Sequence, residues 1–183
     1  SDLLLSAFAR LDREAPLRLV MAGGLPEDLA RLRALAAALG IADRVDFTGF
    51  LPPLEAARLQ RTADILVIPT LDTEAGRYPL TVKIFEYMVA GRPIVATRIP
   101  ANEEILTDGE TAFLADATPE ALAGGLARAV RDPGLRRRLA TNARALALAE
   151  YTWERRGEKT LAFLQRRLAG APAGRPCEAG VPA

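Results

Sequence analysis

Five short apolar runs, each followed by a turn and a segment of helical character, constrain the fold of this chain more than any other feature. The runs cover residues 17–24, 44–50, 64–70, 93–97 and 111–115. Most are near-continuous stretches of Val, Ile and Leu, which is typical of strands buried on both faces. Parallel strands of this kind are joined by helical crossovers. We therefore predict an α/β fold, doubly wound, with a parallel sheet and helices on both faces.

The bulk properties narrow the function classes. A length of 183 residues suits one domain, and a net charge of +1 gives no argument for a nucleic-acid partner. The single cysteine, Cys177, cannot form an internal disulfide, which favours a reducing compartment. The chain has no histidine, which excludes a histidine-based triad or zinc site within it. No apolar run approaches the roughly 20 residues of a membrane helix.

The two ends of the chain are unlike the middle. Residues 170–183 are rich in Gly, Pro and Ala and lack periodicity, so we predict a disordered tail after a domain that covers residues 1–169. The chain opens with Ser1 inside a helical pattern. We interpret it as a piece of a longer protein.

Ligands of doubly wound sheets bind beyond the carboxyl ends of the strands, so the loops that follow the predicted strands are the place to look. The first such loop carries Gly23 and Gly24 between a strand and a helix. Glycine there allows a ligand to approach the backbone, and the helix N-terminus favours anions. Because the full GxGxxG pattern is absent, a plain tight turn is the alternative interpretation.

The segment PLTVKIFEYM (79–88) places charges in an apolar helix. Thr81 is suited to cap this helix, which would leave the N–H groups of Val82, Lys83 and Ile84 to face an anion. Lys83 adds a point charge suited to phosphate, and Glu86, about one turn deeper, could accept from the hydroxyls of a ribose. The alternative is a solvated Lys–Glu pair, worth only about 0.2–0.5 kcal/mol. Apolar residues around most of the helix favour burial, and buried charges need partners.

Three further charged segments have simpler explanations. Asp72 and Glu74 could hold a divalent metal beside a diphosphate, but a turn is favoured, and we predict no metal site. Glu103 is assigned to helix capping, while Glu104 could line the cleft. The basic residues of the predicted helix at 153–168 are assigned to a solvated charged face rather than to a lipid or domain contact.

Read in order, these segments resemble the C-terminal, donor-binding domain of GT-B glycosyltransferases, specifically glycosyltransferase family 4. The resemblance covers residues 1 to about 168, and the Rossmann-like sheet is the fold it implies. It rests on six segments in sequence: VMAGG, RVDFTGFLP, ADILVIPT, KIFEYMVAGRPIVAT, EEILTDGETAFL and YTWERRGEKTLAFL.

The resemblance implies roles for individual residues. Glu86 matches the second of two family glutamates and would bind the donor ribose. The first would fall on Tyr78, which is not an acid, so the catalytic residue is unassigned, and Glu74 could substitute if the loop bends differently. The stretch Leu80–Lys83, which includes Thr81 and Val82, would give backbone N–H groups to the diphosphate.

The base and the upstream strand complete the implied site. Phe50 and Leu51 would lie near the base, and Gly23 near the bound nucleotide. The family also uses an arginine and a lysine from a first strand and loop, which would precede Ser1.

The implied activity is transfer of a sugar from a nucleotide-sugar to an acceptor, with retention and without metal or cofactor. The acceptor would be held by a missing N-terminal domain of the same protein. We expect a cytoplasmic location, and the absent half leaves peripheral contact with the inner face of the membrane open. A non-catalytic nucleotide-sugar binding module, or a nucleotide-sugar 2-epimerase on the same fold, are the alternatives.

Overall fold

A computed structural model gives the structure of residues 1–73 and 81–169. Its strands are β1 (Leu19–Ala22), β2 (Val45–Gly49), β3 (Leu66–Ile68), β4 (Ile94–Thr97) and β5 (Phe113–Ala115). Every pairing between them is parallel, in the order β1-β2 and β3-β4-β5. The predicted parallel α/β fold is confirmed. It differs from the prediction in one respect, because within the described residues β1 and β3 are not paired and the strands form two sheets.

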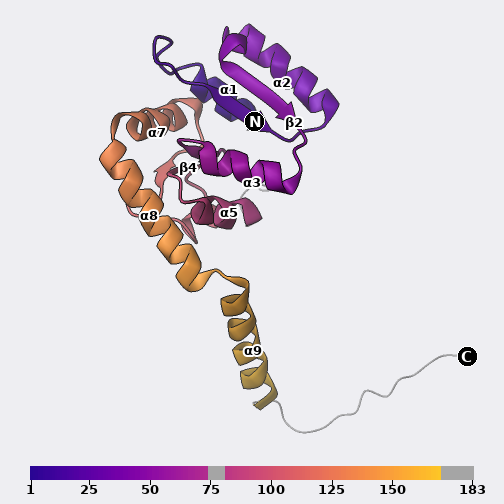
Figure 1. Ribbon diagram of the computed structural model, residues 1–183, viewed down its shortest axis with the longest axis vertical. Helices are drawn as coiled ribbons and strands as arrows, with labels where there is room; N and C mark the ends of the chain where they lie inside the picture. Colours follow the sequence, from indigo (N-terminus) through magenta and orange to yellow (C-terminus); the bar gives the residue numbers. More distant parts are fainter. Residues whose placement is uncertain (74–80, 170–183) are drawn as a thin grey trace, which may run out of the picture.

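Helices connect and cover these strands (Figure 1). They are α1 (Asp2–Phe8), α2 (Pro26–Ala38), α3 (Pro53–Thr62), α5 (Val82–Ala90), α6 (Pro100–Glu103), α7 (Pro119–Arg131), α8 (Pro133–Glu150) and α9 (Trp153–Ala169), with a 3-10 turn at Ala42–Arg44. Proline opens α2, α3, α6, α7 and α8, where its missing N–H costs nothing. The side chains of Thr118 and Asp132 cap α7 and α8 by accepting from backbone N–H groups.

Two apolar clusters lie on opposite faces of the strands. One contains Val95 of β4 with residues of α1, α2 and α7, and the other contains Ile94 and Ala96 with residues of α5 and α8. Because neighbouring residues of β4 enter different clusters, this strand is buried on both faces. That double burial explains its continuous apolar sequence.

The C-terminal helix α9 leads away from the body of the molecule (Figure 1). All its residues from Trp153 to Leu168 are exposed, the apolar ones included. Its basic residues include two that form exposed ion pairs, Arg155 with Glu158 and Lys159 with Glu150. The tail predicted at 170–183 lies outside the described residues. In the part of the chain that is described, no helix has the length and apolar character needed to cross a membrane.

Candidate functional site

A cavity of about 650 Å³ lies between β1 and β3 and collects most of the predicted site residues. Five of the predicted residues line it: Gly23, Phe50, Leu51, Lys83 and Glu86. They follow β1 and β2 or belong to the helix after β3, so the cavity reaches the carboxyl ends of the strands. Ligands of doubly wound sheets bind at this edge.

Gly23 closes β1 in a conformation that favours glycine. Its φ is +93°, and its N–H donates to the carbonyl oxygen of Gly49 at 2.7 Å, which ties the ends of β1 and β2 together. A Cβ atom built on Gly23 would meet no atom within 4 Å. The backbone of the turn is therefore open on this side, and its contact with a ligand stays a prediction.

The start of α5 differs in part from its prediction. Thr81 is the N-cap residue, but its side chain makes no capping hydrogen bond. The N–H of Ile84 donates to the Thr81 carbonyl oxygen at 3.1 Å, so it does not face an anion as predicted. Val82 and Lys83, the first two helical residues, keep N–H groups that have no intrahelical acceptor. Both residues are exposed, and Leu80 lies outside the described residues.

Lys83 and Glu86 both line the cavity without pairing with each other within the described residues. Glu86 instead accepts a hydrogen bond of 3.3 Å from the Nε2 of Gln60 on α3, a residue that the sequence did not single out. The expected burial of α5 is wrong, because only Ile84 and Met88 are buried. The helix turns its charged side toward the open cavity, so these charges stay hydrated.

Two aromatic side chains border the cavity in different ways. Phe50 is 83% exposed just beyond the end of β2, with most of its ring accessible to a ligand. Tyr87 is half-buried on α5, where burial and then the neighbouring Glu86 carboxylate raise the pKa of its hydroxyl. Leu51 is half-buried next to Phe50. The exposed aromatic surface of the cavity therefore lies at its β2 side.

The predicted catalytic and metal residues fall in the loop before α5. Glu74 and Tyr78 lie outside the described residues, and Asp72 is exposed. Within the ranges 1–73 and 81–169, no group of three or more Asp, Glu, His or Cys side chains is arranged to hold a metal ion.

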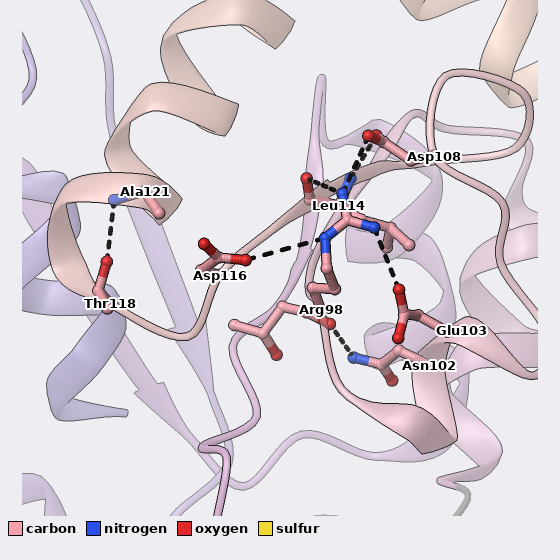
Figure 2. A network of polar contacts seen from close by, with 9 residues as sticks. Arg98, Asn102, Glu103, Asp108, Leu114, Asp116, Thr118 and Ala121 are labelled. Carbon is pink, nitrogen blue, oxygen red and sulfur yellow. Dashed lines mark hydrogen bonds and ion pairs between the residues drawn. The ribbon is translucent and has the colours of Figure 1, made fainter.

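An ionic network centred on Arg98 was not foreseen from the sequence (Figure 2). Its guanidinium lies 3.1 Å from Glu103, 3.1 Å from Asp108 and 3.8 Å from Asp116. Glu103, predicted as a capping acid, thus belongs to this network. Glu104 is exposed and is not among the residues that line the cavity. The network ties the ends of β4 and β5 together, so we assign it to structure.

Comparison with known proteins places the chain in a family. The model of the family described as glycosyl transferases group 1 matches residues 1–146. The chain belongs to this family. A D-inositol 3-phosphate glycosyltransferase from Acidothermus cellulolyticus is 34% identical over 157 residues, which is 83% of this chain and 34% of that protein. The chain thus spans about a third of the length of this relative.

Solved structures agree on the fold. Sucrose-phosphate synthase from Thermosynechococcus elongatus superposes with a TM-score of 0.78 at 23% identity, over 93% of this chain and 42% of that one. HepE from Anabaena, in complex with UDP, gives 0.77 at 22% identity, over 90% and 44%. The predicted resemblance to GT-B glycosyltransferases is confirmed at the level of fold and family, whereas assignment to family 4 stays a prediction.

Proposed function

We propose that this chain is the donor-binding part of a glycosyltransferase and that its cavity holds the nucleotide-sugar. The observation that carries the proposal is the convergence of Gly23, Phe50, Lys83 and Glu86 on one cavity at the carboxyl ends of the strands. Family membership supplies the reaction class. The acceptor would bind to a further domain of the longer protein, since the relatives are two to three times as long.

The start of α5 is the proposed diphosphate site. The N–H groups of Val82 and Lys83 and the Lys83 ammonium lie at a helix N-terminus, where the macrodipole favours negative charge. A nucleoside diphosphate gains negative charge as the bond to the sugar breaks. Fixed N–H donors and a lysine stabilise that charge in the transition state. This arrangement needs no metal ion, and we propose transfer with retention on the strength of the family resemblance alone.

Glu86 and Phe50 are the proposed ribose and base contacts. A carboxylate accepts from both hydroxyls of a ribose, and Gln60 restrains the Glu86 carboxylate through its 3.3 Å hydrogen bond. Phe50 offers an accessible ring on which a base can stack. HepE binds UDP, and a relative from Mycolicibacterium smegmatis carries GDP-mannose in its name, so uridine and guanosine diphosphates are the first probes.

Calorimetry with UDP and GDP tests the diphosphate site. Val82→Pro removes one N–H at the first helical position, where proline is tolerated, and Thr81 already has the extended backbone (φ −87°, ψ 137°) that precedes a proline. We expect this variant to fold normally and to bind the preferred nucleotide about 10-fold more weakly, as one lost hydrogen bond to a charged group implies. Undiminished binding by Val82→Pro would remove the α5 amides from the site.

Side-chain variants test whether the charges of Lys83 and Glu86 contribute to nucleotide binding. Lys83→Ala and Glu86→Ala should each weaken nucleotide binding by about 10–100-fold. Lys159→Ala and Glu55→Ala are matched controls, because Lys159 of α9 pairs with Glu150 of α8 and Glu55 is exposed on α3 outside the cavity. A 2-deoxyribose nucleotide should lose affinity for the wild-type chain and none for Glu86→Ala. Equal binding by Glu86→Ala and the wild type contradicts its role.

A non-catalytic binding module is the second candidate, and Tyr78 favours it. This residue replaces the acid that the resemblance expects near the donor sugar. An assay of the longer protein distinguishes the transferase from the binding module. The assay contains UDP-sugars or GDP-sugars and an excess of chelator. Release of free nucleotide indicates a metal-independent transferase, and tight binding without release indicates the module.

A further inference from the structure

A second cavity, of about 370 Å³, lies at the amino ends of β3 and β4, and α8 forms its other wall. Asp64 comes two residues before β3 and Arg92 two residues before β4, and both line this cavity. Its volume falls within the range of about 300–1,000 Å³ that is usual for pockets of small ligands. Neither Lys83 nor Glu86 lines it, so it is distinct from the proposed nucleotide site.

Three arginines from two segments border this second cavity, which we call the arginine cavity. Arg92 stands in the turn between α5 and β4, while Arg136 and Arg137 belong to the first two turns of α8. Helix α8 packs along α5, which brings the two segments together (Figure 1). Asp64 is the one carboxylate in the lining, and within the ranges 1–73 and 81–169 no ion pair joins these arginines to an acid. The lining therefore carries an excess of positive charge.

Backbone carbonyl groups anchor two of the three guanidinium groups. The Nε of Arg92 donates to the carbonyl oxygen of Arg61 at 2.8 Å. The Nη1 of Arg136 donates to the carbonyl oxygens of Ala129 and Val130 at the end of α7, both at 2.8 Å. A guanidinium carries five N–H donors, so this capping of α7 leaves the Nε and Nη2 of Arg136 without an acceptor in the described part of the chain, as are both Nη atoms of Arg92. Because these side chains are already held, they lose little further freedom when an anion binds.

The face of α8 that borders the arginine cavity combines charge with small side chains. Arg136, Arg137, Ala140 and Thr141 lie on it, and one helical turn separates the first pair from the second. Ala140 is small and buried, which leaves room beside the arginine side chains. Thr141 is exposed, and among the described residues its hydroxyl has no hydrogen-bond partner. This face thus presents guanidinium and hydroxyl donors around one hollow, which is the surrounding that an oxyanion requires.

We propose that the arginine cavity binds the phosphate group of a phosphomonoester. Such a group carries about −1.5 to −2 charges at pH 7, which matches three guanidinium groups beside one carboxylate. Its oxygens accept bidentate hydrogen bonds from the planar guanidinium fork, a geometry that the ammonium of lysine does not provide. The proposal does not rest on the proposed function, since no residue of the proposed diphosphate site takes part in it.

Calorimetry of the chain 1–183 with glycerol 3-phosphate, at low ionic strength, tests the arginine cavity. Arg137→Ala should weaken binding about 10-fold, as the loss of a hydrogen bond to a charged group implies. Arg138→Ala is the matched control, because Arg138 is the next residue of α8, is also exposed and lies outside the cavity. It should change the affinity less than about twofold, as an exposed and screened charge does. Equal losses in the two variants would indicate a general attraction of anions to α8 and would overturn the proposal.

Two further variants should change the affinity for glycerol 3-phosphate in opposite directions. Arg92→Lys keeps the charge but removes the guanidinium fork and its hydrogen bond to Arg61, so binding should weaken about 10-fold. Asp64→Asn removes the one carboxylate of the lining, so binding should tighten about 2–5-fold. Because misfolding does not tighten binding, the second result does not depend on how well a variant folds. Unchanged affinity in both variants contradicts the proposal.

Vesicles distinguish a soluble phosphomonoester from a lipid headgroup with the same chemistry. Binding of glycerol 3-phosphate without binding to phosphatidylcholine vesicles that contain phosphatidate assigns the soluble form. Tighter binding to these vesicles, weakened by Arg137→Ala and not by Arg138→Ala, assigns the headgroup.

Two other results would overturn the proposal. The first is the absence of saturable binding up to about 10 mM glycerol 3-phosphate together with the absence of vesicle binding. The second is loss of phosphate binding in Lys83→Ala, which would move the phosphate to the start of α5 and support the proposed function instead. Nucleotide is absent from these measurements, so failure of the arginine cavity is distinguishable from failure of the proposed function.

Discussion

Strands β1 and β4 are both four-residue apolar strands, yet their surroundings differ. All four residues of β4 are buried, and Val95 at its centre has no exposed surface. In β1 only Leu19 is buried, and Val20 is 42% exposed. Strand β4 has a partner on each edge, whereas within the described ranges 1–73 and 81–169 β1 pairs with β2 alone. A run of apolar residues therefore identifies a strand, while its neighbours determine how much of it is buried.

The largest expected contrast is between the same substitution in the two strands. Val95→Ala removes two methyl groups from a closed core and should cost about 2–3 kcal/mol of unfolding free energy. Val20→Ala in the chain 1–183 should cost within about 0.5 kcal/mol, as surface changes usually do. Urea unfolding of both variants measures the two costs. Similar values would mean that β1 is as well packed as β4.

The next largest loss of unfolding free energy is expected at the carboxyl end of β4. Thr97 closes β4 with its hydroxyl fully buried, and its Oγ1 donates to the carbonyl oxygen of Thr70 at 2.7 Å. Thr97→Val keeps the shape but leaves that carbonyl without its donor, so we expect a loss of about 1–2 kcal/mol. Thr97→Ser retains the hydroxyl and should lose less in the same unfolding measurement. A larger loss for serine would assign the effect to packing.

At the carboxyl end of β1, the backbone conformation of Gly23 constrains which residue can occupy the position. Gly23→Ala adds a Cβ atom that meets nothing, but at a φ of +93° alanine is strained by about 1 kcal/mol. Gly124→Ala is the matched control, because Gly124 is exposed in α7, its Cβ atom also meets nothing, and alanine favours a helix. The two variants should move the melting temperature in opposite directions. A neutral Gly23→Ala would show that the turn relaxes.

The smallest effect concerns the ion pair that links β2 to the residue before β1. Arg18 lies 2.8 Å from Asp46, and its hydrogen bond and then its charge lower the pKa of that carboxyl below the usual 3.8. A lowered pKa in the folded state means that the stabilisation is present above pH 3.8 and is lost as the pH falls through the folded value. Asp46→Asn should therefore lower the melting temperature slightly at pH 7, and this difference should shrink as the pH falls below 3.8. A difference that does not change with pH would require another cause.

Much of the fold follows from local sequence. Continuous apolar runs located the strands, because double burial leaves no place for polar residues, and prolines with Thr118 and Asp132 located helix starts. The same reasoning brought Gly23, Lys83 and Glu86 to one edge of the sheet. It failed where an outcome depends on contacts between distant segments. The Gln60 contact with Glu86 joins two residues of different helices that are 26 positions apart in sequence, and the Arg98 network joins the residue after β4 to α6 and to the segment before β5.

Burial of α5 was overestimated for a related reason, and α9 shows the same effect. An apolar helix face predicts a partner but does not say that the partner lies within the same chain. Helix α5 opens onto the cavity, and α9 exposes Leu161, Phe163 and Leu164. In both cases the sequence pattern reports a surface that needs a cover, and the described residues do not provide one.

The packing of α1 against α7 has a consequence for synthesis. Leu5 and Leu122 belong to the same buried cluster, but 117 residues separate them in the chain. At about 5–20 residues per second, a ribosome completes α7 roughly 6–25 s after α1. During that interval the apolar face of α1 lacks the cover that α7 provides and is open to nascent-chain binding factors. A chain that stops before α7 leaves that part of the face exposed, so premature termination should yield a product prone to aggregation.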